Sequence, residues 1–287
     1  MVDTIEPGYM GVAEIGGFSV RCTDFSGDVN QEFGFYNHVI GLNDTTPADS
    51  KTKDEAIGVI QPQRTFVKPN PLSIEGTMSF PATENNLSFF FDSIKYGTYI
   101  DEFTFYYYCR ESRKFLDSRL STFSLEITAG EILNITVGFV SKEIEDAAGL
   151  KAYSTAEKLI TWDQVDITIN DADFSSNDLL KGFTLDVTNP IEMIYTLLPS
   201  NNMSDLAPHD LRIGMQEVSG VVTFYLRDGL DILPDCVDPA AASTIDLDIP
   251  GLNETLNVLF LPRKTSGVTN AVASTIGFVG IDKALGD

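Results

Sequence analysis

The sequence of 287 residues has little positive charge: 19 Lys and Arg stand against 42 Asp and Glu, which gives a formal net charge of −23. Gripping a nucleic-acid backbone requires clustered cations, so this balance argues strongly against a DNA- or RNA-binding protein. The acids are scattered along the chain instead of forming one run. We therefore expect them to lie on solvated faces and on a lined surface, not in an acidic tail.

Cysteine is also scarce. The three cysteines, Cys22, Cys109 and Cys236, are far apart and form no CxxC spacing. This pattern provides neither a zinc site nor a redox pair, and the odd number does not fit a disulfide framework. We interpret the three residues as buried free thiols of a protein made in a reducing cytosol.

The sequence lacks the segments that direct a chain to a membrane. The first ten residues, MVDTIEPGYM, contain no basic region followed by an apolar stretch, and no later segment approaches ~18 uninterrupted apolar residues. We therefore expect a protein that neither enters a membrane nor is secreted by its own signal.

Common catalytic motifs are absent: the sequence has no GxSxG, P-loop, GxGxxG after a strand, or HExxH. His38 and His209 have no obvious nucleophile near them and are interpreted as surface histidines. The run NDADFSSND at 170–178 resembles the start of a calcium loop but lacks its glycine and its closing glutamate. We expect no catalytic residue, no metal and no cofactor, although a glycosidase-like carboxylate pair stays open among 42 acids.

What the sequence does contain favours a mainly β fold. Hydrophobic residues make up 43%, aromatic residues 10%, and Thr, Val and Ile recur in short runs between Gly and Asn. Residues 43–71 differ, because they are rich in Asp, Thr, Pro and Lys and poor in core residues. They predict a long loop or an extended hairpin that contacts a neighbouring molecule.

One helix is predicted in the stretch ENNLSFFFDSIKYG. Its apolar residues have helical spacing, i, i+3, i+4 and i+7, and are Leu87, Phe90, Phe91 and Ile94. Asn85 or Asn86 is the expected N-cap and Gly97 the expected C-cap. A phenylalanine stripe of this kind is typical of a helix face packed on a sheet, not of a ligand site.

The second half of the sequence repeats features of the first half in the same order. CTDFS at 22–26 is similar to DADFS at 171–175, and SIEGTMSF at 73–80 is similar to EVSGVVTF at 217–224, each with a central glycine. STFSLEITAGEILNITV from Ser121 is similar to STIDLDIPGLNETLNVL from Ser243. These pairs predict a tandem duplication, with a first β domain at 1–145, a linker at 146–158 and a second β domain at 159–287.

The segments GTMSFPATENNLSFFF and STFSLEITAGEILNITVGFVSKEI resemble phage tail tube proteins, most clearly over Phe18 to Ile144. In that family a strand with a central glycine precedes a flanking helix, and a later hairpin carries a turn such as AGE. The resemblance implies two tandem antiparallel β-sandwich or barrel domains, the first with a flanking α-helix. It also implies a structural virion protein whose inner sheets join edge to edge in rings, which stack into the tube through which DNA is ejected.

Other functions stay open at this point. A tail hub or completion protein uses the same fold, and a carbohydrate-binding or adhesive β-sandwich module has a similar composition. An enzyme is a third alternative.

The resemblance carries expectations about assembly. If six tube domains close a ring, three two-domain chains suffice, and six chains are the alternative. Expected partners are further copies of the chain, the tape measure, and hub or sheath proteins; DNA passes without specific binding, and no membrane takes part. The particle is a virion tail, assembled in the host cytoplasm.

Two groups of residues are predicted to serve this assembly. The long loop is expected to bridge stacked rings. The residues expected to make these contacts are Asn43 and the four cations Lys51, Lys53, Arg64 and Lys68. The lumen is expected to be acidic and polar, with Glu126, Asp246 and Asp248 as candidate lining residues, because a duct for DNA must not hold the phosphates that it passes.

Overall fold

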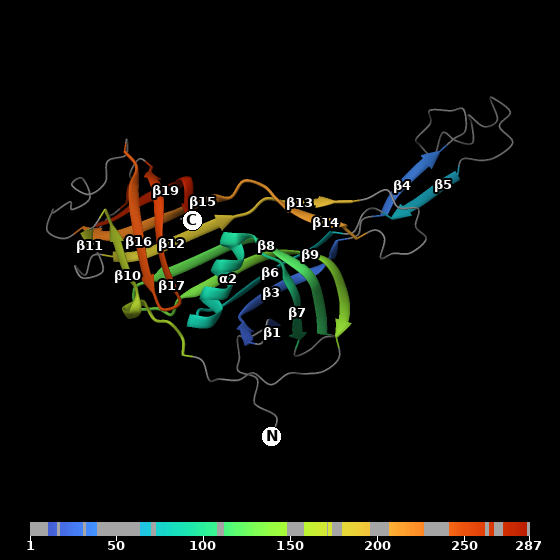
Figure 1. The fold of residues 1–287 in the computed structure, drawn as a ribbon, viewed down its shortest axis with the longest axis horizontal. Coiled ribbons are helices and arrows are strands. Elements are labelled where there is room, and N and C mark those ends of the chain that lie inside the picture. Colours follow the sequence, from blue (N-terminus) through green and yellow to red (C-terminus); the bar gives the residue numbers. More distant parts are fainter. Residues whose placement is uncertain are drawn as a thin grey trace, which may run out of the picture.

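The computed structural model describes residues 11–15, 18–30, 33–38, 64–69, 73–107, 112–147, 158–170, 172–173, 180–195, 207–226, 241–261, 264–266 and 272–285. The fold is mainly β with large antiparallel sheets, which confirms the predicted fold class (Figure 1). The strands of the first half are β1 (Gly11–Ile15), β2 (Phe18–Cys22), β3 (Asp24–Asn30), β4 (Phe33–His38), β5 (Arg64–Pro69), β6 (Ser73–Pro81), β7 (Ile100–Tyr107), β8 (Ser112–Thr128) and β9 (Asn134–Ala147).

The strands of the second half are β10 (Asp166–Ile169), β11 (Ala172–Asp173), β12 (Leu180–Thr188), β13 (Ile191–Ile194), β14 (Asp210–Ile213), β15 (Glu217–Leu226), β16 (Ser243–Ile249), β17 (Leu252–Phe260), β18 (Lys264–Ser266) and β19 (Val272–Leu285). A short 3-10 turn, η1 (Trp162–Gln164), precedes β10. β9 continues two residues into the predicted linker, and residues 148–157 lie outside the described part.

In the first half the paired strands follow the order β3-β6-β9-β8-β7-β1-β2. Strands from different parts of this order pack around a phenylalanine-rich core. Phe25 of β3 stacks on Phe105 of β7 with ring centroids 3.6 Å apart, and Phe139 of β9 lies edge-on to Phe103 and Phe115. All five rings are buried, so the core joins strands that are distant in the sheet order.

In the second half the order is β12-β15-β19-β17-β16-β10-β11, and β18 pairs with β19 beyond the end of β17. The pairing order of the second half is the same as that of the first half. In this comparison β3 corresponds to β12, β6 to β15 and β9 to β19, and the long strand β8 corresponds to β17 together with β18. The buried rings of this half are Phe183, Phe224, Phe260 and Phe278, and they belong to the same continuous hydrophobic core as the phenylalanines of the first half.

The strand register supports one predicted sequence pair and replaces another. Gly76 of β6 lies opposite Phe139 of β9, and Gly220 of β15 lies opposite Phe278 of β19. The five residues TVGFV at 136–140 therefore correspond to TIGFV at 275–279. The expected match of the 121–137 hairpin with 243–259 does not fit this order, because β16 and β17 occupy the places of β7 and β8.

Helix α2 (Glu84–Tyr96) is the α-helix predicted from the sequence. All four residues of its apolar stripe are buried against the sheet, and Gly97 ends it in the left-handed conformation at φ 59°, as predicted. The predicted N-cap is wrong, because Thr83 is the cap and Asn86 is the third helical residue. The two side chains form a reciprocal capping box, which satisfies two backbone N–H groups at once.

Two further strand pairs lie outside the large sheet. β4 pairs antiparallel with β5, which favours the extended hairpin over the loop for this part of the predicted 43–71 segment. The connecting residues 39–63 lie outside the described part. β13 pairs with β14 in the second half, and both pairs extend from the same end of the molecule (Figure 1).

Candidate functional site

The large sheet contains an uninterrupted series of eight strands that spans both halves. Its order is β3-β6-β9-β8-β12-β15-β19-β18, and every neighbouring pair is antiparallel. The halves meet at β8 and β12, which pair from Thr122 opposite Thr188 to Thr128 opposite Gly182. The Ser124 hydroxyl donates a 2.6 Å hydrogen bond to Oδ1 of Asp186 across this seam.

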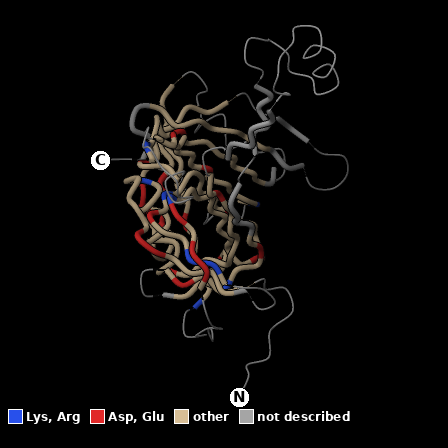
Figure 2. Tube along the Cα trace, turned by 90° about the vertical axis from the view of Figure 1, so that its right-hand side faces the viewer, with Lys and Arg blue, Asp and Glu red and all other residues tan. Residues whose placement is uncertain are grey.

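The two faces of the eight-strand sheet differ in chemistry. On β8 the buried face carries Phe123, Leu125 and Ile127, and strand periodicity places Ser124 and Glu126 on the opposite face. Most positions on this opposite face are hydroxyl, amide or carboxylate residues, and the register also places Lys264 on it, opposite Thr275. The polar positions are Glu75, Thr77, Ser79, Thr122, Ser124, Glu126, Asn134, Thr136, Thr184, Asp186, Thr188, Glu217, Ser219, Thr223 and Thr275. Figure 2 shows Asp and Glu positions at many places along the chain trace.

The structure separates the three predicted lining residues. Glu126 is exposed on β8, within the eight-strand sheet. Asp246 and Asp248 lie on β16, beside β10 and β17, where Asp246 accepts a 2.5 Å hydrogen bond from the Thr255 hydroxyl. The alternation that predicted all three polar positions is correct, since Ile245, Leu247 and Ile249 are buried. Alternation gives the face of a strand but not the layer to which the strand belongs.

The predicted cations of the long loop are only partly placed. Asn43, Lys51 and Lys53 lie outside the described residues. Arg64 and Lys68 belong to β5, at backbone positions opposite His38 and Gly34 of β4. His209, which precedes β14, is exposed, as expected for a surface histidine.

The C-terminal end of α2 forms a joint with the second half. The last-turn carbonyl of Ile94 accepts hydrogen bonds from the side-chain amides of Asn189, at 2.7 Å, and Gln216, at 3.0 Å. The last carbonyls of a helix have no intrahelical partner, so these amides satisfy a group that burial would otherwise penalise. Sequence reasoning missed this joint, because Asn189 and Gln216 stand about a hundred residues or more from the helix.

An ion pair lies at the same joint. Lys95 Nζ contacts both carboxylate oxygens of Glu254 on β17, at 2.8 and 2.9 Å, and the two side chains are only 10% and 11% exposed. Burial lowers the pKa of Lys95, but the hydrogen bond to Glu254 and the charge of Glu254 outweigh burial and raise the pKa above its ordinary value.

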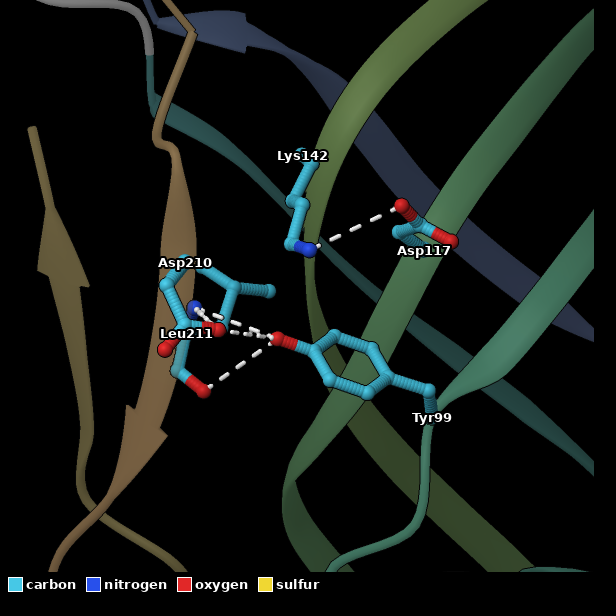
Figure 3. A network of polar contacts seen from close by, with 5 residues as sticks. All are labelled: Tyr99, Asp117, Lys142, Asp210 and Leu211. Carbon is cyan, nitrogen blue, oxygen red and sulfur yellow. Dashed lines mark hydrogen bonds and ion pairs between the residues drawn. The ribbon is translucent and has the colours of Figure 1, made fainter.

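A third set of contacts attaches β14 to the first half (Figure 3). The Tyr99 hydroxyl donates to Oδ1 of Asp210 at 2.8 Å and accepts from the backbone N–H of Leu211 at 3.2 Å. The guanidinium of Arg119 lies 3.9 Å from the centroid of the Tyr99 ring. The hydrogen bond from Tyr99 is the main cause that lowers the pKa of Asp210. These contacts attach β14 of the second half to Tyr99, which precedes β7 of the first half, and Arg119 of β8 packs on the Tyr99 ring.

Among the described residues, no group of three or more His, Cys, Asp and Glu side chains could hold a metal ion. Cys22 is buried, and burial raises the pKa of its thiol, which therefore stays protonated at neutral pH. No helix in the described part of the chain is long and apolar enough to cross a membrane.

Comparison with protein families agrees with the resemblance seen in the sequence. Residues 11–280 match a family described as phage tail tube protein. The chain belongs to the phage tail tube protein family. It is therefore a structural component of a phage tail, and a tail tube protein assembles with copies of itself and with other tail proteins. No curated protein matches the chain.

Proposed function

We propose that three copies of this tail tube protein close a ring, that rings stack into the tube, and that DNA is ejected through the lumen. The observation that carries the proposal is the eight-strand sheet. Each chain would add two four-stranded units, β3-β6-β9-β8 and β12-β15-β19-β18, so three chains would supply six units. The repeated strand order also supports a duplicated tube domain as the origin of the chain.

The lumen is lined by the polar face of this sheet. Hydroxyl groups keep the wall hydrated, and the carboxylates of Glu75, Glu126, Asp186 and Glu217 repel the phosphates of the passing duplex within about one Debye length, ~8 Å at physiological salt. Asp246 and Asp248 lie on β16, outside the eight-strand series, so we leave them out of the proposed lining. The tube thereby guides DNA without binding it.

Electron microscopy of the purified protein tests the ring. We expect annular particles and tubes of constant width. An isolated ring should have the mass of three chains. A ring of six chains would contradict the trimer while keeping the tube, and a protein that forms no ring or tube under any condition would contradict the proposed function.

A charge reversal tests the lining. Glu126→Lys places a cation on the proposed wall and should slow DNA ejection from particles that still assemble. Asp248→Lys is the matched control, because Asp248 lies on β16, outside the eight-strand series, opposite Asp166 of β10. Equal ejection rates for both variants would contradict the placement of the lumen.

We further propose that residues 43–71 connect stacked rings through their cations. The hairpin partners His38 and Arg64 lie opposite each other, so an Asn-Gly turn in place of residues 39–63 closes the β4–β5 pair without the connecting segment. This variant should form rings that fail to elongate. Tubes of normal length would contradict the role of the connecting segment.

A further inference from the structure

Corresponding strands in the two halves have different numbers of neighbours. β12 pairs with β15 on one side and β8 on the other, whereas its counterpart β3 pairs with β6 alone among the described strands. The end of β8 likewise pairs with β9 and β12, whereas its counterpart β18 pairs with β19 alone in the described part of the chain. The pairing of β8 with β12 inside the chain therefore joins the counterparts of β18 and β3, the two strands that end the eight-strand series.

The register relates β3 to β12 residue by residue. Gly27 of β3 lies opposite Gly76, and Leu185 of β12 lies opposite Gly220. Aligned on these positions, DFSGDVN at 24–30 corresponds to GFTLDVT at 182–188, with identical Phe, Asp and Val. Phe25 and Phe183 are both buried, which agrees with the alignment. Asp28 is thereby the counterpart of Asp186.

The same procedure relates β18 to the end of β8. Within TVGFV and TIGFV, Thr136 corresponds to Thr275, and the residues opposite them are Ser124 and Lys264. Leu120 lies opposite Phe139, and Phe260 lies opposite Phe278. Leu120 and Phe260 are 140 positions apart in the sequence, as are Ser124 and Lys264, so neither half has an insertion between these two points. Lys264 is thereby the counterpart of Ser124, and Ser266 of Glu126.

We propose that β18 of one copy pairs antiparallel with β3 of the next copy in the register that β8 and β12 adopt within the chain. This register places Lys264 of one copy opposite Asp28 of the other, where the internal seam has Ser124 opposite Asp186. Thr265 then faces Gly27, and Ser266 faces Ser26. The inference rests on the proposed ring and names the two edges that close it.

Residue chemistry at these positions fits a contact between separate molecules. Residues directly opposite each other in an antiparallel pair share one face, and an ammonium opposite a carboxylate is favourable there, while like charges are unfavourable. Pairing also occupies backbone donors and acceptors at both ends of the series, which removes the hazard of open strand edges. A second copy of this chain is the partner that presents both edges in the correct order.

Cysteine cross-linking tests the register directly. Ser26→Cys together with Ser266→Cys should give, under oxidising conditions, covalent multimers that end at the closed ring, because the two positions lie opposite each other. The pair Asn30→Cys and Ser266→Cys is shifted by four residues and should link at least about tenfold less. Single-cysteine variants control for links through the native cysteines.

Charge exchange tests the proposed pair. Lys264→Glu and Asp28→Lys should each raise the protein concentration needed for half-assembly by about tenfold or more, and the double variant should restore most of the loss. If wild-type rings form but the shifted cysteines link equally well, or the double variant is no better than the singles, the register is wrong. If the wild type forms no rings, the proposed function itself is wrong.

Discussion

The ion pair between Lys95 and Glu254 should contribute far more to stability than a surface pair of equal length. Lys114 Nζ lies 2.8 Å from Oε2 of Glu102, the same distance as in the Lys95 pair, but these side chains are 29% and 54% exposed. The two pairs differ in burial, and Lys114 also lies 4.0 Å from Oε2 of Glu145, whereas Lys95 contacts both oxygens of Glu254. They form a matched comparison within one molecule.

Truncating one partner of the buried pair leaves the other charge with little access to water. Removing one partner of a fully buried pair costs about 3–5 kcal/mol, so with about one tenth of each side chain exposed we expect ~2–4 kcal/mol for Lys95→Met or Glu254→Gln. The double variant should lose less than the sum of the single variants, because no lone charge remains. For Lys114→Met and Glu102→Gln the coupling should be much smaller, because solvent screens the charges of exposed pairs.

Urea unfolding of unassembled subunits, analysed as two double-mutant cycles, measures both couplings. Since the pKa of Lys95 is raised in the folded protein, its contribution is complete below the ordinary lysine value of 10.5 and is lost as pH rises through the folded value. Couplings of equal size for the two pairs would refute the reasoning, because burial would then have no effect.

Three further outcomes follow from single contacts. Gly220→Ala should cost about 2–3 kcal/mol of unfolding free energy, because its methyl group would meet the Thr184 carbonyl and the Phe278 ring, whereas exposed Ser219→Ala should stay within about 0.5 kcal/mol. Asn189→Ala should cost about 1–3 kcal/mol by removing a donor to the Ile94 carbonyl, and exposed Asn134→Ala is its control; equal losses would contradict the role of the joint. Tyr99→Phe should raise the pKa of Asp210 toward its ordinary value in an NMR titration; the wild type loses this carboxylate's contribution as pH falls below about 3.8, and an unchanged pKa in the variant would contradict the assignment.

The sequence was sufficient for features that depend on neighbouring residues. Helical spacing of Leu87, Phe90, Phe91 and Ile94 predicted α2 and its buried face, and Gly97 predicted its end. The N-cap was missed because Asn and Thr both cap helices well, and only the structure shows that Thr83 binds the third helical residue. The sequence alone was compatible with several N-cap residues for α2, and the structure shows which of them caps the helix.

Features that depend on strand order were beyond the sequence. Asp246 and Asp248 alternate with buried residues just as Glu126 does, yet β16 pairs with β10 and β17, outside the eight-strand series that contains Glu126. A period of two places a side chain on one face of its strand and carries no information about which strand lies beside it. The similar segments at 136–140 and 275–279 could be recognised as counterparts only from the strand register, because Phe139 and Phe278 each lie opposite a glycine.

In the proposed ring, the seam inside each chain and the seam between chains have the same strand geometry but form under different physical conditions. Inside the chain, β8 and β12 are tethered, so their encounter requires no attraction at long range, and a hydroxyl opposite Asp186 suffices. In the proposed contact between chains, β18 and β3 would meet by diffusion among molecules that each carry a net charge of −23 and repel one another. A lysine opposite Asp28 supplies local attraction against that repulsion and penalises a shifted register, which is the role that complementary charges play at interfaces. The serine-to-lysine difference between the seams thus follows from the difference between folding and association.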